Sequence, residues 1–336
     1  MDVSKHSRLL GLCLLLLSSV FTVIAQAQTC LTHSDMDEPI RSALESTAKR
    51  YFNLAARGDT AALKQNATAS LAANFSSVES AVKDSQASFS GAQAQPRPPF
   101  LLKIEGDKPL ERAEFLCGVF GKNGQTANSA AFVIPNLAPS TYGLVTLEIA
   151  GGPTAQTVSF VLQQQGADWK IGGFYVHASE AAGHDADWFA DKARSFKTKG
   201  QNRDAWLYYL EARELAVPVP FMYTQITDKL YDESQAVKPA DLPLDGNTVD
   251  LPSAGKTYKL TTLSPAGVGQ DIDVVVKYQA SDVSHTAEAF KDNMAVIHAL
   301  VTKYPELRDA FGGVVARAVE PSGQDYGSML PMKEIK

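Results

Sequence analysis

The chain has 336 residues and a hydrophobic fraction of 45%, which is enough for two or three domains with packed cores. Its formal net charge is −6, and it contains no basic patch and no long run of one charge, which argues against a broad nucleic-acid surface. Beyond the N-terminal segment, no stretch is apolar over the length of a membrane span. We therefore expect no nucleic-acid partner, and no membrane span once that segment is removed.

Residues 1–27 have the pattern of a signal peptide. Lys5 and Arg8 form a basic start, residues 9–25 are almost wholly apolar, and a small-x-small cleavage site ends at Ala27. A retained membrane anchor is the less favoured alternative, because the apolar run is near the lower limit for spanning. We predict cleavage after Ala27 and export to the periplasm or the extracellular space.

The next segments predict helices. In residues 38–57 apolar side chains repeat every three or four positions, as on the buried face of a helix. Asp59 can cap a second helix, and residues 78–89 indicate a third. Residues 90–99 contain one glycine and three prolines, and we expect an irregular loop there.

A run of strands follows these helices. Alternating hydrophobic residues place strands at 100–104, 115–119, 131–134 and 144–149, with a turn at 121–124. Helices followed by mainly hairpin-linked strands predict an α+β fold with a curved antiparallel sheet.

The last two strands of this run, within residues 158–178, form a predicted β-hairpin. The pair Gly172-Gly173 interrupts the second strand, and paired glycines inside a strand usually mark a β-bulge. One extra residue moves every later side chain of the strand to the opposite face of the sheet. Phe174 should therefore point into the same core as the residues before the bulge, whereas Tyr175 and His177 should point the other way.

After residue 178 the apolar period changes from two to about 3.6, which predicts two helices separated by Gly200. The pair, within residues 185–231, resembles a single tetratricopeptide repeat over about 34 residues. An array needs about three repeats to stand alone, so we expect this helical hairpin to pack on its neighbours. Trp188, Phe189 and Phe196 should then be largely buried.

The C-terminal part is predicted to form a separate, smaller unit. Residues 232–255, with Pro239 and Pro243, have the composition of a linker. Residues 256–336 contain two strand patterns, a strong helical stripe and a further strand pattern. This order predicts a β-β-α-β unit with one helix on a face of a small sheet.

Three features are similar to the nuclear transport factor 2-like superfamily: the helix–Gly58-Asp59–helix opening, the curved sheet, and Gly-x-x-Trp-Lys-Ile-x-Gly-Phe at 166–174. The resemblance covers residues 37–178 and implies a cystatin-like α+β cone, in which the sheet wraps round the first helix and forms a cavity. Some members are ketosteroid isomerases or dehydratases, and many others only bind ligands or proteins. A cone joined to a single helical hairpin also resembles exported bacterial proteins that have no assigned activity.

Tyr51, Tyr175 and His177 are the candidate pocket residues, on the expectation that His177 faces the interior of such a cone near the two tyrosines. An imidazole there could transfer protons, as general acid–base catalysis requires. No carboxylate can be placed beside His177 from the sequence, so a structural histidine is the favoured interpretation.

His184, Asp185 and Asp187 have side chains of the kind that bind metals, but a zinc or calcium site needs three or more ligands in a fixed geometry. The two aspartates are better explained as negative charges at a helix N-terminus. The glycine pairs at 151–152 and 312–313 lack the Lys-Ser/Thr of a phosphate loop. We therefore expect no catalytic, metal-binding or cofactor-binding residues.

Cys13 leaves with the signal peptide, so Cys30 and Cys117 remain in an oxidising compartment. A disulfide between them would tie the flexible N-terminus to a strand. Alternatively, Cys117 is a buried thiol among apolar neighbours. Both alternatives stay open.

Three functional hypotheses follow. The favoured one is an exported, non-catalytic binding or scaffold protein whose cone holds a small apolar ligand or a partner segment. The second is a cone-type isomerase or dehydratase that uses His177 with a tyrosine. The third is a protein-interaction module that acts through the helical hairpin, whose aromatic residues exceed what two short helices need for packing.

Overall fold

The computed structural model describes residues 28–120, 125–152, 154–244, 246–253 and 255–336. The predicted signal peptide and the predicted turn at 121–124 lie outside these residues. The described chain is a mixed α+β protein with several antiparallel sheets, in agreement with the predicted fold class. None of the helices in this part is long and apolar enough to span a lipid bilayer.

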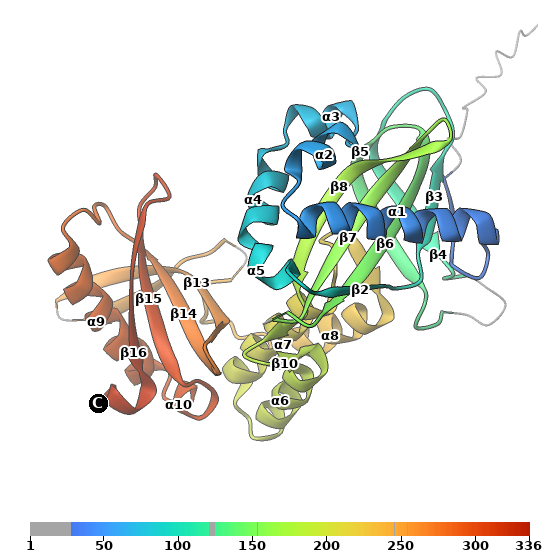
Figure 1. The fold of residues 1–336 in the computed structure, drawn as a ribbon. Coiled ribbons are helices and arrows are strands. Elements are labelled where there is room, and N and C mark those ends of the chain that lie inside the picture. The colour runs from blue at the N-terminus through green and yellow to red at the C-terminus, as the bar shows by residue number, and fades with distance from the viewer. Residues whose placement is uncertain (1–27, 121–124, 153, 245, 254) are drawn as a thin grey trace, which may run out of the picture.

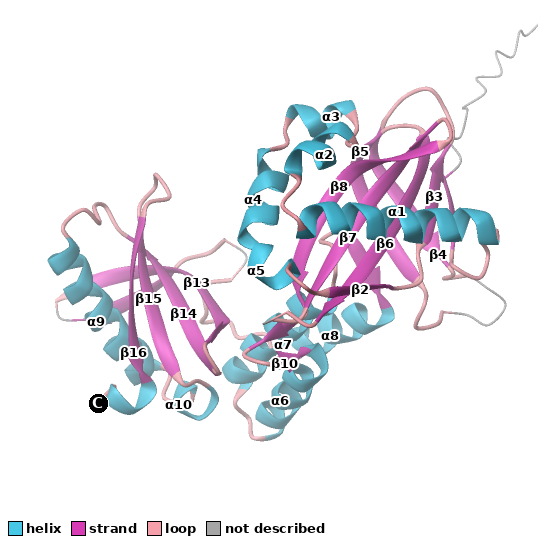
Figure 2. Cartoon of the chain, in the orientation of Figure 1, coloured by secondary structure: helices cyan, strands magenta, loops and turns pink. Residues whose placement is uncertain are grey.

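Short helices and a twisted sheet make up the first half of the chain (Figure 1). The helices are α1 (Glu38–Ala56), α2 (Thr60–Gln65), α3 (Ala69–Ala73), α4 (Ser76–Asp84) and α5 (Gln86–Phe89). Sheet A consists of β1 (Gln28–Leu31), β2 (Gln93–Pro96), β3 (Phe100–Ile104), β6 (Ser140–Ala150), β7 (Gln156–Gln165) and β8 (Asp168–Ala178). Its order is β1-β3-β6-β7-β8, with β2 also paired to β6. Figure 2 shows the helices gathered on one face of this sheet.

A hydrophobic core fills the space between α1 and sheet A. Leu44 and Tyr51 of α1 are fully buried, and the Tyr51 ring lies 6.1 Å from the ring of Phe160 on β7. Gly143 on β6 permits this close approach, because a Cβ at that position would lie 2.2 Å from Leu44 Cδ2. The helix predicted at 38–57 is thus confirmed, and its apolar face is the buried one.

The predicted β-bulge in β8 is confirmed. The register between β7 and β8 slips by one residue at Gly172, which has no partner on β7. Phe174 therefore packs in the core beneath α1, and Tyr175 packs on the opposite face of sheet A. The bulge decides which of these two aromatic side chains faces the helices.

The loop predicted at residues 90–99 is wrong in part, because β2 forms within it and pairs antiparallel with the end of β6. Pro96 is tolerated as the last residue of β2, and the next amide, of Arg97, donates to the carbonyl of Thr146 on β6. Pro98 and Pro99 then interrupt the strand before β3 begins on the same side of β6. The partner of β2 lies far along the chain, so the local sequence carries no sign of this pairing.

Sheet B packs on the face of sheet A that is turned away from α1. It consists of β4 (Leu110–Cys117), β5 (Ala130–Leu137) and β11 (Met222–Thr224), in the order β11-β5-β4. Phe115 and Phe132 from sheet B share one hydrophobic core with Tyr142 and Leu144 from sheet A. The first unit therefore has three layers, namely helices, sheet A and sheet B.

A helical unit follows sheet A. The strands β9 (Glu180–Ala181) and β10 (His184–Asp185) form a small hairpin before α6 (Ala186–Thr198), α7 (Asn202–Ala216) and α8 (Gln225–Gln235). Phe189 and Phe196 are buried, as predicted. Trp188 is less completely buried than these two, but it packs against the same hydrophobic core. Its indole lies at the edge of the helix pair, stacked 3.7 Å from the ring of His184.

The C-terminal unit has more strands than the predicted β-β-α-β order. It contains β12 (Val249–Ser253), β13 (Lys256–Val268), β14 (Asp271–Gln279), α9 (Thr286–Lys303), α10 (Leu307–Ala310), β15 (Gly313–Val319) and β16 (Asp325–Pro331). The sheet has the order β12-β13-β14-β15-β16, and α9 makes the crossover between the parallel strands β14 and β15. The edge strands β12 and β16 were missed because each gains its stability from one neighbour only.

The predicted linker 232–255 is also shorter than expected, because α8 continues to Gln235 and β12 occupies Val249–Ser253. The helical unit and the C-terminal unit share one hydrophobic core. Within it, the Tyr208 hydroxyl of α7 donates to the carbonyl of Ala310 in α10 at 2.5 Å. The expectation that the helical hairpin packs on its neighbours is therefore confirmed.

Candidate functional site

A cleft of about 590 Å³ lies on the face of sheet A opposite α1. Its walls come from sheet A, from residues 133–138 on and after β5, and from residues 220–223 at β11. None of its sixteen lining residues is Asp, Glu, Lys, Arg or His. We call it the uncharged cleft, and its size and its mixture of apolar and neutral polar side chains are typical of small-molecule sites.

Tyr175 is the most distinctive side chain of the uncharged cleft. Its ring lies edge-on to Phe221 with the ring centroids 5.5 Å apart. It also covers Gly173, where a Cβ would come within 2.9 Å of the ring. The bulge therefore turns Tyr175 toward the cleft, and the missing side chain at Gly173 leaves room for the ring.

The hydroxyl of Tyr175 is free to meet a ligand. Within the described residues it makes no hydrogen bond, whereas the hydroxyl of Tyr142 in the same cleft donates to the carbonyl of Ala138 at 2.8 Å. Burial raises the pKa of Tyr175 above its ordinary value, so the group stays protonated at neutral pH. A protonated phenol can donate a hydrogen bond to an acceptor in the cleft.

The structure does not bring together the predicted pocket residues Tyr51, Tyr175 and His177. Tyr51 is buried on the α1 side of sheet A, where its hydroxyl donates to the carbonyl of Trp169 at 2.6 Å and burial raises its pKa. Tyr175 and His177 point to the other side, and only Tyr175 lines the uncharged cleft. The proposed site fails because sheet A itself separates Tyr51 from the other two.

His177 has a partner that the sequence did not reveal. Its Nε2 lies 2.9 Å from the carbonyl oxygen of Glu214 and 3.7 Å from the Glu214 carboxylate. The carbonyl belongs to the last turn of α7, where its own helix supplies only the Val217 amide, at 3.5 Å. Burial lowers the pKa of His177, although Glu214 opposes this shift. The neutral ring, with Nε2 as donor, therefore joins β8 to the end of α7.

The residues considered as metal ligands lie at the start of α6. Asp185 caps this helix by accepting a hydrogen bond from the Trp188 amide at 2.9 Å, as the sequence predicted. His184 stacks on Trp188, and Asp187 lies in the first turn. Within the described ranges, no group of three or more His, Cys, Asp or Glu side chains has the arrangement of a metal site.

Cys30 and Cys117 form a disulfide, with their Cα atoms 5.1 Å apart. The bond joins β1 of sheet A to β4 of sheet B. Of the two alternatives that the sequence left open, the buried thiol is thus excluded. The disulfide holds the two sheets that form the walls of the uncharged cleft.

Sequence reasoning missed most of the uncharged cleft. The sequence analysis assigned no role to the segment after the second helix of the hairpin, yet that segment provides Pro220, Phe221 and Tyr223 to the site. No local pattern links this segment to β5, with which β11 pairs. The sequence signal that did bear on this cleft was the pair Gly172-Gly173, because the β-bulge that it predicts turns Tyr175 toward this face of sheet A.

Comparison with protein-family models, with curated proteins and with solved structures found no significant match for this chain. The geometry of its own residues is therefore the basis for assigning a function.

Proposed function

We propose that this protein is an exported, non-catalytic binding protein whose uncharged cleft holds a small, uncharged and largely apolar ligand. The observation that carries the proposal is the lining of the cleft, which combines aromatic and aliphatic side chains with a few neutral polar ones and has no ionisable acid or base at neutral pH. A charged ligand would lose its hydration there without gaining a counter-charge, which is costly. An apolar ligand gains about 25 cal/mol for each Å² of surface that it buries.

The nuclear transport factor 2-like resemblance is compatible with both binding and catalysis, and the geometry of this chain favours binding. A cone enzyme of this kind would need an acid–base group inside an open cavity. Here the space between α1 and sheet A is filled by packed side chains, and His177 is bonded to the end of α7. The ligand site that we propose is therefore on the opposite face of the sheet, and the isomerase or dehydratase hypothesis loses its catalytic group.

Export is part of the same proposal. The signal-peptide pattern at residues 1–27 supports it, and so does the Cys30–Cys117 disulfide, because such bonds persist in oxidising compartments. N-terminal sequencing of the extracytoplasmic protein should read Gln28 as the first residue. An intact Met1 in that fraction would contradict the cleavage site, and absence of the protein from that fraction would contradict the proposed location.

The binding proposal predicts that the uncharged dye Nile red, which carries a carbonyl acceptor, binds the purified mature protein with increased fluorescence. Ala138→Trp, which places an indole in the cleft, should weaken binding at least tenfold. Tyr175→Phe should weaken it by about threefold to tenfold, since one hydrogen bond contributes roughly 0.5–1.5 kcal/mol. The measurement is a fluorescence titration of each variant at equal concentration.

A matched control is Ala167→Trp, the same substitution at an exposed alanine in the turn between β7 and β8. It should leave binding unchanged. Equal weakening by both tryptophan variants would show that the dye binds elsewhere, and the proposal would then be wrong. Tighter binding of an anionic analogue would contradict the assignment of an uncharged ligand.

A protein-interaction role is the second candidate, and one surface favours it. Tyr223, Ile226 and Tyr231 on β11 and α8 are 46%, 55% and 48% exposed. Tyr223 and Tyr231 line the same hollow beside α7, and exposed large apolar side chains are a feature of partner-binding sites. If they bind a protein, Ile226→Ser combined with Tyr231→Ser should abolish cross-linking to that partner in the native host without lowering the melting temperature.

A further inference from the structure

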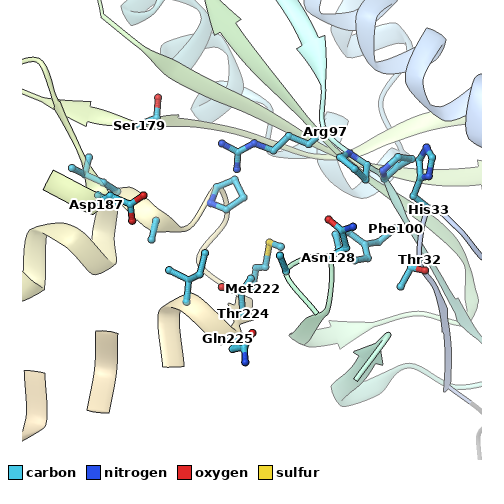
Figure 3. A pocket seen from close by; sticks show the side chains of 18 of the residues that line it. Thr32, His33, Arg97, Phe100, Asn128, Ser179, Asp187, Met222, Thr224 and Gln225 are labelled. Carbon is cyan, nitrogen blue, oxygen red and sulfur yellow. The ribbon is translucent and has the colours of Figure 1, made fainter. Parts of the chain in front are cut away.

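A second cavity, of about 490 Å³, lies where the β-sheet unit meets the helical unit. One wall comes from the turn after β1 and from the segment between β2 and β3, and the other from the start of α6 and the segment between α7 and α8. Figure 3 shows the side chains that line it. This junction groove differs from the uncharged cleft because its lining includes the cation Arg97 and three acids, Glu180, Asp185 and Asp187.

Arg97 provides the positive charge of the junction groove. Its Nε donates to the Glu148 carboxylate at 2.9 Å, and its backbone amide donates to the carbonyl of Thr146 at 2.8 Å. Within the described residues, the two terminal nitrogens of the guanidinium make no further hydrogen bond or ion pair. The side chain is thus held through Nε, while its two terminal nitrogens are open. These two nitrogens have the geometry that binds a carboxylate through two hydrogen bonds.

Asp187 provides a negative charge on the opposite wall. Helix α6 is already capped by Asp185, so the carboxylate of Asp187 is not needed for that role. In the described part of the chain, Asp187 has no hydrogen-bond or ion-pair partner of its own. Figure 3 shows Arg97 reaching into the groove toward the wall that carries Asp187 and Ser179.

We propose that the junction groove binds a zwitterionic molecule of the amino-acid or short-peptide class, with its carboxylate on Arg97 and its ammonium group on Asp187. A ligand with one charge would satisfy one wall and meet a like charge on the other. A ligand with both charges pairs with both walls and leaves neither group desolvated without a partner. Phe100, Leu215 and Met222 also line the groove and provide apolar surface for a hydrophobic side chain.

The test uses the dipeptide alanyl-phenylalanine, its N-acetyl derivative and its C-terminal amide, each titrated into the full mature protein by calorimetry. The free dipeptide should bind, and each derivative should bind at least tenfold more weakly, because each lacks one of the two charges. Arg97→Gln should bind the dipeptide and its amide equally weakly. Asp187→Asn should bind the dipeptide and its N-acetyl form equally weakly.

The control is Arg112→Gln, which removes an exposed arginine of β4 that does not line the groove. It should bind the free dipeptide as the wild type does. The proposal is overturned if the free dipeptide does not bind, if blocking either end has no effect, or if Arg112→Gln weakens binding as much as Arg97→Gln. Stronger binding of the N-acetyl form by Asp187→Asn than of the dipeptide by the wild type would also overturn it, because the groove would then be an anion site.

Discussion

At pH 8, Asp204→Asn should raise the free energy of unfolding by up to about 4 kcal/mol, because a pKa shift of one unit corresponds to about 1.4 kcal/mol. Asp204 lies in the first turn of α7, is 0% exposed, and has no hydrogen-bond partner for either carboxylate oxygen within the described residues. Burial raises its pKa to about 7, and the neighbouring acids Glu306 and Asp309 add to this shift. Arg203 and Lys199 oppose it without compensating for the burial.

The effect should depend on pH with a definite sign. The folded state keeps a proton on Asp204 up to about pH 7, whereas an unfolded chain releases it near its ordinary value of 3.8. Between these limits the folded state binds more protons, so the contribution of Asp204 to stability is full below about pH 4 and is lost as the pH rises to 7. The variant and the wild type should therefore differ little at pH 4 and most at pH 8.

Urea unfolding of both proteins across this pH range measures the difference directly. Asp309→Asn is the matched control, since it makes the same chemical change at an exposed acid of the same cluster. Its effect should stay below about 1 kcal/mol, as for other exposed charges. A stability gain for Asp204→Asn that is the same at pH 4 and pH 8 would mean that Asp204 does not change its charge in this range.

The second large effect concerns the disulfide. Replacing both Cys30 and Cys117 with serine should lower the free energy of unfolding by about 4 kcal/mol, because the bond closes a long loop and restricts the unfolded chain. The two residues are 87 positions apart and join sheet A to sheet B. Denaturation followed by tryptophan fluorescence checks this, since Trp169 is buried in sheet A.

A thiol reductant provides the control for this prediction. It should destabilise the wild-type protein by about the same amount and leave the double serine variant unaffected, because the variant has no bond to reduce. A wild-type protein whose unfolding curve does not change on complete reduction would contradict the stabilising role. Loss of Nile red binding on reduction would further connect the bond with the uncharged cleft.

Local patterns predicted the elements whose stability depends on nearby residues. The helix at 38–57, the hairpin around the glycine pair and the helices α6 and α7 all follow from apolar periods within one segment. The short strands β2, β11, β12 and β16 have no such signal. The strands β2 and β11 pair with strands far along the chain, whereas β12 and β16 are edge strands, each paired with one neighbour that satisfies its backbone groups.

The candidate sites were harder to predict than the elements. Tyr175 was recognised from the bulge, but its neighbours in the uncharged cleft come from β5 and from the segment before α8. His177 was recognised as a titratable group, but its partner Glu214 lies on a helix of the next unit. Arg97 lies within the predicted irregular loop at residues 90–99. Only the pairing of β2 with β6 places it opposite Asp187.

The sequence by itself determined the α+β class, the order of the main elements, and the face on which Phe174 and Tyr175 each lie, because hydrophobic burial acts through periods of two and 3.6 within a segment. Only the tertiary structure decided that Tyr51 and His177 are separated by sheet A, that Cys30 meets Cys117, and that two cavities of different charge exist. Each of these depends on how distant segments pack against one another. No period within a single segment records that packing.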